Sequence, residues 1–260
     1  MRAQRHKPNQ LRPSFVDRVE LAMSKSCHVD GVWIGSLRGS PEDLTRVEGA
    51  LSLIKQHSPL DYARIIRELE RIWVTLSFYG VGQYRHALKA CILDERYVAD
   101  SATTAEQIAS AIVHEATHAR LERYGIAYKE ELRTKIEAIC CRRELAFAVR
   151  LPNSTELQEI EQRLQWYQAN PDQFSDARFR EKHTAGEVEA LRFLGSPDWL
   201  IGALIASRSI IGRVRRFSPA IAWTIRTTIS IPFVIGFGLS YAVVTLLDPK
   251  ASSKSEPPEE

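Results

Sequence analysis

The sequence predicts an α+β fold in which a small sheet packs against several helices. The strand signal is clearest in RIWVTLSF at residues 71–78, where apolar side chains occupy every second position and glycines at 80 and 82 end the pattern. Elsewhere, apolar residues recur at the three- and four-residue spacing of amphipathic helices. With 44% hydrophobic and 26% charged residues, a chain of 260 residues can bury an ordinary core in one or two domains.

The elements on either side of this strand follow from local signals. The Ser-Pro pair at 40–41 suits an N-cap followed by proline at the first helical position, and a second helix is expected after the Ser-Pro pair at 58–59. The segments HALKACIL and RYVAD, separated by the acids at 94–95, are expected to form two further short strands. The sheet would then lie between helices.

A run of helices is expected after the strands. Thr103 and Glu106 have the spacing of a capping box, and the apolar pattern that follows ends at Gly125. Further helices are expected over 128–149, from about 153 onward and in HTAGEVEALRFLG, before the composition changes at 196–197.

Charge and cysteine usage exclude some functional classes. The chain has 35 basic and 32 acidic residues, a net charge of +3, and this even balance argues against a nucleic-acid partner. Four cysteines without a CxxC pair favour a reducing compartment. The basic start of the chain lacks the apolar core of a secretory signal, so we expect a poorly ordered segment, with a transit peptide as the alternative.

One motif carries the chemistry of the sequence. Residues 111–125 read AIVHEATHARLERYG and contain His-Glu-x-x-His at His114, Glu115 and His118. Helical residues four apart differ by about 40° in direction, so both imidazoles can hold one ion, whereas Glu115 points about 100° away and can act as a general base. The alternative, a solvated helix face, would place polar residues around them. Their neighbours are Ala, Ile and Val, and burying such groups is costly without an ion.

A catalytic zinc site needs a third protein ligand. The metzincin continuation would require glycine at 121 and histidine at 124, where the chain has Leu121 and Tyr124. In the next helix, Glu137 is bracketed by Ile, Ala and Cys and is expected to point inward. The acids at 130–131 lie at a helix start, where the helix dipole already favours them. Glu137 is therefore the expected third ligand.

This arrangement resembles the gluzincin metallopeptidases, which carry the motif on one helix and a glutamate ligand on the next, after short strands. The resemblance covers roughly residues 60–150. It implies a zincin-like fold with Zn²⁺ bound by His114, His118 and Glu137, and Glu115 activating a water that attacks a peptide carbonyl. It also implies that a strand before the motif helix holds the substrate.

The chain departs from this family at the residue that would contact a ligand histidine. Many gluzincins have an acid about four positions after the third ligand, hydrogen-bonded to a ligand histidine, and here that position is Cys141. Glu144 and Asp94 are the alternatives for this role. Cys140 and Cys141 point about 100° apart on a helix, which favours core packing over a second metal site.

The groups that would stabilise an oxyanion are not fixed by any pattern. His183 and Tyr167 lie beyond the third-ligand helix and could reach into a cleft. A structural role on a helix is the alternative for both.

The C-terminal part of the sequence is apolar. Between Arg226 and Asp248 no residue is charged, and about 21 residues suffice for a helix of about 30 Å. We expect a transmembrane helix, with a buried core helix as the alternative. The basic amphipathic residues before it favour an interfacial segment on anionic lipid, or a second or re-entrant membrane segment. The excess of arginine on the N-terminal side predicts a cytoplasmic catalytic domain.

Five regions are thus expected. They are a basic, poorly ordered segment (1–27), a zincin-like metallohydrolase domain (28–195), a basic interfacial segment (196–226), a transmembrane helix (227–247) and a polar tail (248–260). The expected function is a membrane-anchored zinc metallopeptidase, and its expected partners are a peptide or protein substrate and membrane lipid. The alternatives are an inactive zincin-fold scaffold or binding protein, against which Glu115 argues, and a zinc hydrolase of non-peptide substrates.

Overall fold

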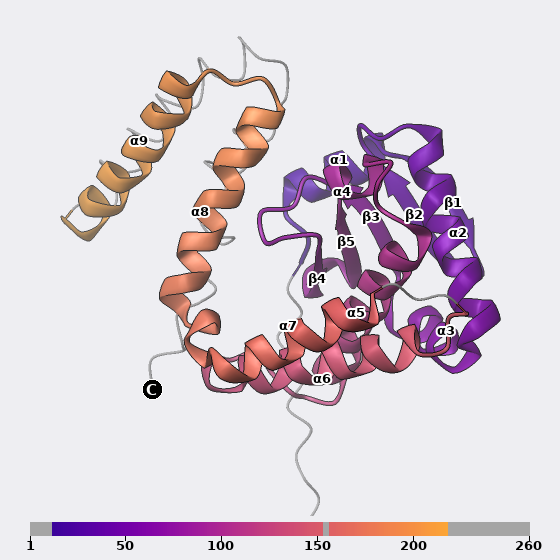
Figure 1. The fold of residues 1–260 in the computed structure, drawn as a ribbon. Coiled ribbons are helices and arrows are strands. Elements are labelled where there is room, and N and C mark those ends of the chain that lie inside the picture. Colours follow the sequence, from indigo (N-terminus) through magenta and orange to yellow (C-terminus); the bar gives the residue numbers. More distant parts are fainter. Residues whose placement is uncertain (1–11, 153–155, 218–260) are drawn as a thin grey trace, which may run out of the picture. The chain divides into compact units, whose positions relative to one another are not determined.

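The computed structural model describes residues 12–152 and 156–217, which form an α+β fold with a small mixed sheet (Figure 1). The strands are β1 (Lys25–Val29), β2 (Val32–Ser36), β3 (Arg71–Thr75), β4 (Gly82–Arg85) and β5 (Ala90–Asp94). The helices are α1 (Phe15–Met23), α2 (Pro41–His57), α3 (Pro59–Glu68), α4 (Glu95–Ala99), α5 (Ala105–Arg123), α6 (Glu130–Ala148), α7 (Leu157–Ala169), α8 (Asp176–Phe193) and α9 (Asp198–Phe217). Short 3₁₀ turns, η1 (His86–Leu88) and η2 (Pro171–Phe174), join some of these elements.

The chain divides into two compact units, Met1–Gly186 and Glu187–Glu260. The first contains the whole sheet and the helices from α1 to α7, together with most of α8. In the second, the described part consists of the end of α8 and α9, joined where Gly195 adopts a φ of 77°. A positive φ is the conformation that a glycine following a helix C-terminus commonly takes.

The sheet has the order β1-β2-β3-β5-β4. Its three central strands are parallel, as the register Ile34↔Ile72↔Cys91 shows, and both edge strands pair antiparallel. The β1–β2 hairpin turns at Asp30 and Gly31, whose φ values of 47° and 88° suit a tight two-residue turn. β4 forms one edge of the sheet and lies beside α5.

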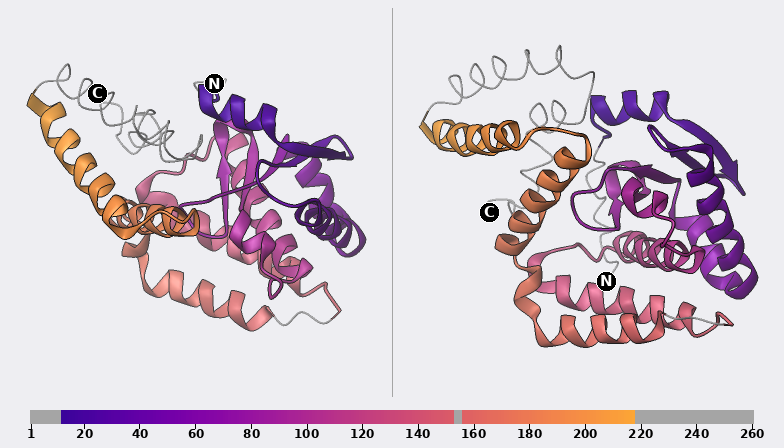
Figure 2. Two further views of the ribbon diagram at one scale, coloured as in Figure 1. Left: turned by 90° about the horizontal axis from the view of Figure 1, so that it is seen from above. Right: turned by 45° about the horizontal axis from the view of Figure 1, so that its top comes forward.

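Both faces of the sheet are covered (Figures 1 and 2). On one face, Ile34, Ile72 and Leu93 pack with apolar residues of α2, α3 and α5 in the main core. On the other face, Trp73 and Ile92 form a smaller cluster, with Leu21 of α1 packed against it. β3 is therefore buried on both sides, as central parallel strands usually are, which the alternation of apolar residues alone does not indicate.

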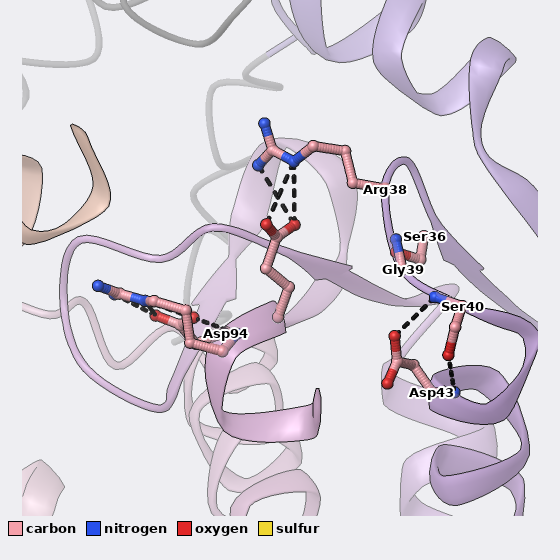
Figure 3. Close-up of polar contacts among 8 residues, drawn as sticks. Ser36, Arg38, Gly39, Ser40, Asp43 and Asp94 are labelled. Atoms are coloured by element: carbon pink, nitrogen blue, oxygen red, sulfur yellow. Dashed lines mark hydrogen bonds and ion pairs between the residues drawn. The ribbon is translucent and has the colours of Figure 1, made fainter. Parts of the chain in front are cut away.

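Paired caps and ion pairs fix the loops at the carboxyl ends of the parallel strands (Figure 3). The Ser40 hydroxyl accepts a hydrogen bond from the Asp43 amide at 3.3 Å, and the Asp43 carboxylate accepts one from the Ser40 amide at 2.7 Å. This capping box starts α2 where the sequence predicted. Arg38 forms an ion pair with Glu95 at 3.2 Å, tying the β2–α2 loop to α4.

Several expectations about the elements were wrong. RYVAD belongs to α4 rather than to a strand, because Asp94 caps the helix by accepting from the Arg96 amide at 2.9 Å. Of HALKACIL, only the part from Ala90 is a strand, since residues 86–88 form a 3₁₀ turn. The sequence patterns also did not indicate β1, β2 or β4.

Two element starts also differ from the sequence prediction. α5 is capped by Thr104 with Gln107, one position later than expected. In the segment 1–27, α1 begins with a capping box between Ser14 and Asp17, and β1 follows directly. The expectation of a poorly ordered N-terminal segment is therefore wrong for residues 14–27.

The predicted membrane segments lie mainly outside the residues that the structure describes. None of the helices within 12–152 and 156–217 is long and apolar enough to cross a membrane. The predicted span at 227–247 and residues 218–226 lie outside the described residues. The remainder of the predicted interfacial segment forms α9, in which Leu200, Ile201 and Leu204 are buried.

Candidate metal centre

Two neighbouring helices bring the motif and the expected third ligand together. α5 packs along α6, and α6 packs along α7 (Figure 1). The motif lies in the middle of α5, which is apolar at Ile108 and Ile112 and is held by the main core. Glu137 lies on the first half of α6 and is only 7% exposed. Its side chain thus faces the motif helix from inside the protein.

The spacing of the three polar groups matches a metal site. Nε2 of His114 and Nε2 of His118 lie 3.2 Å apart. The Glu137 carboxylate reaches them through Oε2, 3.3 Å from His114 Nε2, and Oε1, 3.4 Å from His118 Nε2. Zinc bonds of about 2.0–2.1 Å in tetrahedral geometry separate ligand atoms by roughly 3.3–3.4 Å. The three residues therefore fit one zinc ion.

Neighbouring groups hold the metal-binding atoms in place. Nδ1 of His114 lies 3.1 Å from Oε2 of Glu144. Glu144 follows Glu137 by about two turns on the same face of α6. Once a metal displaces the proton from Nε2, the contact of His114 with Glu144 keeps the remaining imidazole proton on Nδ1. Tyr128, in the loop before α6, donates a hydrogen bond to Oε1 of Glu137 at 2.5 Å. Arg163 of α7 forms an ion pair with the other oxygen of Glu144.

The charges of these groups depend on one another. Burial alone would lower the pKa of His114, but the Cys141 thiol, Glu137 and Glu144 raise it well above its usual value. Burial lowers the pKa of His118 to about 4, so this imidazole is neutral at pH 7. Burial opposes ionisation of Glu137, yet His114 and His118 lower its pKa to about 2. A neutral imidazole and an ionised carboxylate are the forms that bind a cation.

Glu115 lies beside the three candidate ligands, against the edge of the sheet. Burial raises its pKa to about 7, although the nearby His114 and the backbone of Tyr84 in β4 counteract the rise. A β-carbon at Gly82 would lie 3.1 Å from the Glu115 carboxylate, so glycine lets β4 approach closely. A carboxyl group with a pKa near 7 suits proton transfer, and a bound cation would lower that pKa.

The two adjacent cysteines of α6 lie near the histidines. Cys140 and Cys141 are fully buried, as core packing requires. In addition, Cys140 lies within 4.8 Å of ring nitrogens of His114 and His118, and Cys141 is equally near to His114 and Glu144. Burial raises the pKa of the Cys140 thiol far above its usual range, which keeps it protonated and a poor ligand.

The site opens into a cavity of about 590 Å³ between β4 and helices α4 to α7. Gly82, Gln83 and Tyr84 of β4 line it, and so does Tyr167 of α7. Burial raises the pKa of Tyr167 to about 12, so its hydroxyl keeps its proton. His183 instead packs against the rings of Phe78 and Tyr79, with ring centroids 5.5 and 4.8 Å away.

The structure therefore brings together His114, His118, Glu115 and Glu137, and it places Glu144, rather than Asp94, against the candidate ligand His114. The seven-residue spacing of Glu137 and Glu144 could have indicated this, because it spans about two helical turns. Tyr128 and Arg163 were missed, since each reaches the site by tertiary packing that no local pattern marks.

Comparison with known proteins assigns no relative. No protein-family model matches the chain, and neither a curated protein nor a solved structure matches it.

Proposed function

We propose that the chain is a zinc-dependent hydrolase and that its substrate is a peptide or protein. One observation carries this proposal: nitrogen atoms of His114 and His118 and the Glu137 carboxylate have tetrahedral spacing, with the buried Glu115 carboxylate beside them. A site that served only as a structural clamp would have no use for such a base.

The residues present would divide the work as follows. Zn²⁺ bound by His114, His118 and Glu137 would supply a Lewis acid and lower the pKa of a water molecule to about 7. Glu115 would take the proton from the attacking water while the oxygen of that water bonds to the substrate carbonyl carbon. The same carboxyl would then give the proton to the leaving amine as the amide bond breaks.

The substrate peptide would pair, in extended form, with the outer edge of β4. This strand ends the sheet, and its residues Gly82, Gln83 and Tyr84 line the cavity next to Glu115. Main-chain groups on a free sheet edge can pair with a peptide by strand addition. The same pairing is not available to a compact non-peptide substrate, so it favours a peptide.

Tyr167 is our candidate for stabilising the oxyanion. It lines the cavity and its hydroxyl stays protonated, as a hydrogen-bond donor to developing negative charge must. Tyr128 is less suited because it already donates to Glu137. His183 is placed in a ring cluster with Phe78 and Tyr79.

One observation favours the alternative of a structural metal site. Cys140 lies close enough to both histidines to share one ion with them, and a thiol ligand added to the site would occupy the position that a water molecule needs. The same fold could then serve as a membrane-bound scaffold or binding protein. Membrane attachment itself rests on the uncharged sequence at 227–247.

Metal content and hydrolysis together test the proposal. The full chain should carry about one zinc ion, and Glu115→Gln should retain that zinc while losing hydrolysis of a peptide pool, because only the base is removed. Cys140→Ser should keep both zinc and activity. Loss of zinc in Cys140→Ser, or equal hydrolysis by Glu115→Gln and wild type, would show that the site is not catalytic in the proposed way.

A further inference from the structure

The cavity beside the metal centre contains more carboxylates than the proposed reaction uses. Six glutamates line it: Glu115, Glu122, Glu137, Glu144, Glu156 and Glu159. Glu122 pairs with His86 at 2.7 Å, and Glu144 with Arg163. Glu115 and Glu137 belong to the metal centre. Two acids, Glu156 and Glu159, remain without an assigned role.

Glu156 is buried, and one of its two carboxylate oxygens has no hydrogen-bond partner among the described residues. The residue is 7% exposed, and the unpaired oxygen is Oε1. The Ser110 hydroxyl is a polar neighbour of Glu156, and it too makes no hydrogen bond of ordinary geometry among the described residues. A buried carboxyl group with an unpaired oxygen costs free energy, so its place on a cavity wall calls for a ligand.

The surroundings of Glu156 suit an organic cation. Burial raises its pKa to about 7, and the negative charges of Glu144, Glu159 and Glu106 add to the rise, whereas a bound cation would lower it. Apolar and aromatic walls stand beside it in the same cavity, formed by Tyr97, Ala111 and Ile160. Aliphatic stems and cationic heads both bind well against such surfaces.

A second metal ion is a poor occupant. Among the described residues, every group of ligand atoms close enough to share one ion includes His114, and none includes Glu156 or Glu159. The negative charge on this wall of the cavity is therefore shared by Glu156 and Glu159. An ammonium or guanidinium group can bind to two such carboxylates because it has several N–H donors. Arg163, the nearest cation on α7, is already paired with Glu144.

We propose that Glu156 and Glu159 form a subsite that binds a cationic group of the substrate next to the scissile bond. This inference rests on the proposed function, because it makes the substrate of that same site a peptide with a lysine or arginine side chain or a free α-amino group at this position. Both sources supply the same chemistry, a nitrogen cation with N–H donors.

Small capped probes test the subsite without requiring hydrolysis. Binding of N-acetyl-lysine amide, norleucine amide and N-acetyl-norleucine amide to the zinc-loaded full chain would be measured by titration calorimetry. These probes carry a side-chain ammonium, an α-ammonium and no cation, respectively. We expect at least one cationic probe to bind about tenfold or more tightly than the neutral one, the usual strength of a charged hydrogen bond.

Matched variants test whether Glu156 and Glu159 cause the preference for cationic probes. Glu156→Gln keeps the side-chain shape and should abolish the preference for the cation, and Glu159→Gln, at an exposed position, should reduce it less. Glu161→Gln, an exposed acid of the same helix that does not line the cavity, should leave it unchanged. Equal binding of all three probes, or a preference that survives in Glu156→Gln, overturns the inference.

Cleavage of two octapeptide pools, one with capped and one with free N-termini, separates this inference from the proposed function. Cleavage sites enriched in lysine, arginine or a free N-terminus on one side would support both. Hydrolysis without any such enrichment would overturn the subsite and leave the hydrolase standing. A cation preference that depends on Glu156, in a protein that hydrolyses nothing, would support the subsite and overturn the hydrolase.

Discussion

Glu137 and Glu144 occupy one face of α6 and serve different roles at the same histidine. Glu137 approaches the Nε2 atoms, where a metal would bind, and Glu144 contacts Nδ1 of His114 at 3.1 Å. Removing a ligand deletes a bond to the ion, whereas removing the partner of a ligand only loosens its orientation. The two positions should therefore differ in how strongly they control zinc affinity.

Substitutions of three carboxylates of α6 should weaken zinc binding to different degrees. Glu137→Ala should weaken binding most, Glu144→Gln by about 10- to 100-fold, and Glu131→Ala, at an exposed position on the first turn of α6, not at all. Competition with a chromogenic chelator measures all three. Equal effects at positions 137 and 131 would contradict the assignment of the third ligand.

The buried carboxyl group of Glu20 in α1 should make the folding stability depend on pH. It is 7% exposed, and burial raises its pKa from 4.5 to about 7, with Asp17 and Glu95 adding to the rise and Arg38 and Arg85 opposing it. Because the folded-state value is the higher one, the stability that this group contributes is fully present below pH 4.5 and is lost as pH rises through about 7.

Glu20→Gln, which cannot ionise, should therefore be more stable than wild type at pH 8, by up to about 3 kcal/mol, and differ far less at pH 5. Thermal unfolding at the two pH values measures this. A variant that unfolds at the wild-type temperature at pH 8 would show that the buried carboxyl is already solvated or paired.

At the scale of the elements, the sequence predicted what depends on local chemistry. The Ser-Pro pairs are local features that led to the correct starts of α2 and α3. The apolar residues around Glu137 led to its correct placement inside the protein, next to His114. RYVAD was mistaken for a strand because its tyrosine and valine favour strands, while the Asp94 cap decides for a helix. β4, with sequence GQYR, has no apolar alternation and is defined only by pairing with β5.

Two helical glycines test how the elements are packed. At Gly49 in α2, an added β-carbon would meet nothing within 4 Å, so Gly49→Ala should stabilise the protein by about 0.5–1 kcal/mol. At Gly186 in α8, the β-carbon would lie 2.2 Å from the backbone oxygen of Phe78, so Gly186→Ala should destabilise it. Thermal unfolding compares both. Equal shifts would mean that α8 does not approach the loop after β3 so closely.

At the scale of the whole molecule, the predicted membrane span is the feature that decides where the metal centre works. The uncharged run at 227–247 is long enough to span a bilayer, and arginines are concentrated before it. They are Arg208, Arg213, Arg215, Arg216 and Arg226, against only Lys250 and Lys254 after it. Basic residues near a span remain on the cytoplasmic side, so the candidate metal centre should face the cytosol, where the free cysteines of the chain stay reduced.

Carbonate extraction and protease protection measure this arrangement. The full chain should stay in carbonate-washed membranes, whereas Phe237→Arg, near the middle of the run, should weaken insertion by about 3 kcal/mol relative to Ser252→Arg in the polar tail. In sealed, right-side-out cells, external protease should remove a tag placed after Glu260 and leave the metal-binding unit intact. Cleavage of that unit with the tag protected would reverse the orientation, because arginine would then lie on the outer side. Release of the wild-type chain by carbonate would mean that residues 227–247 do not cross the membrane.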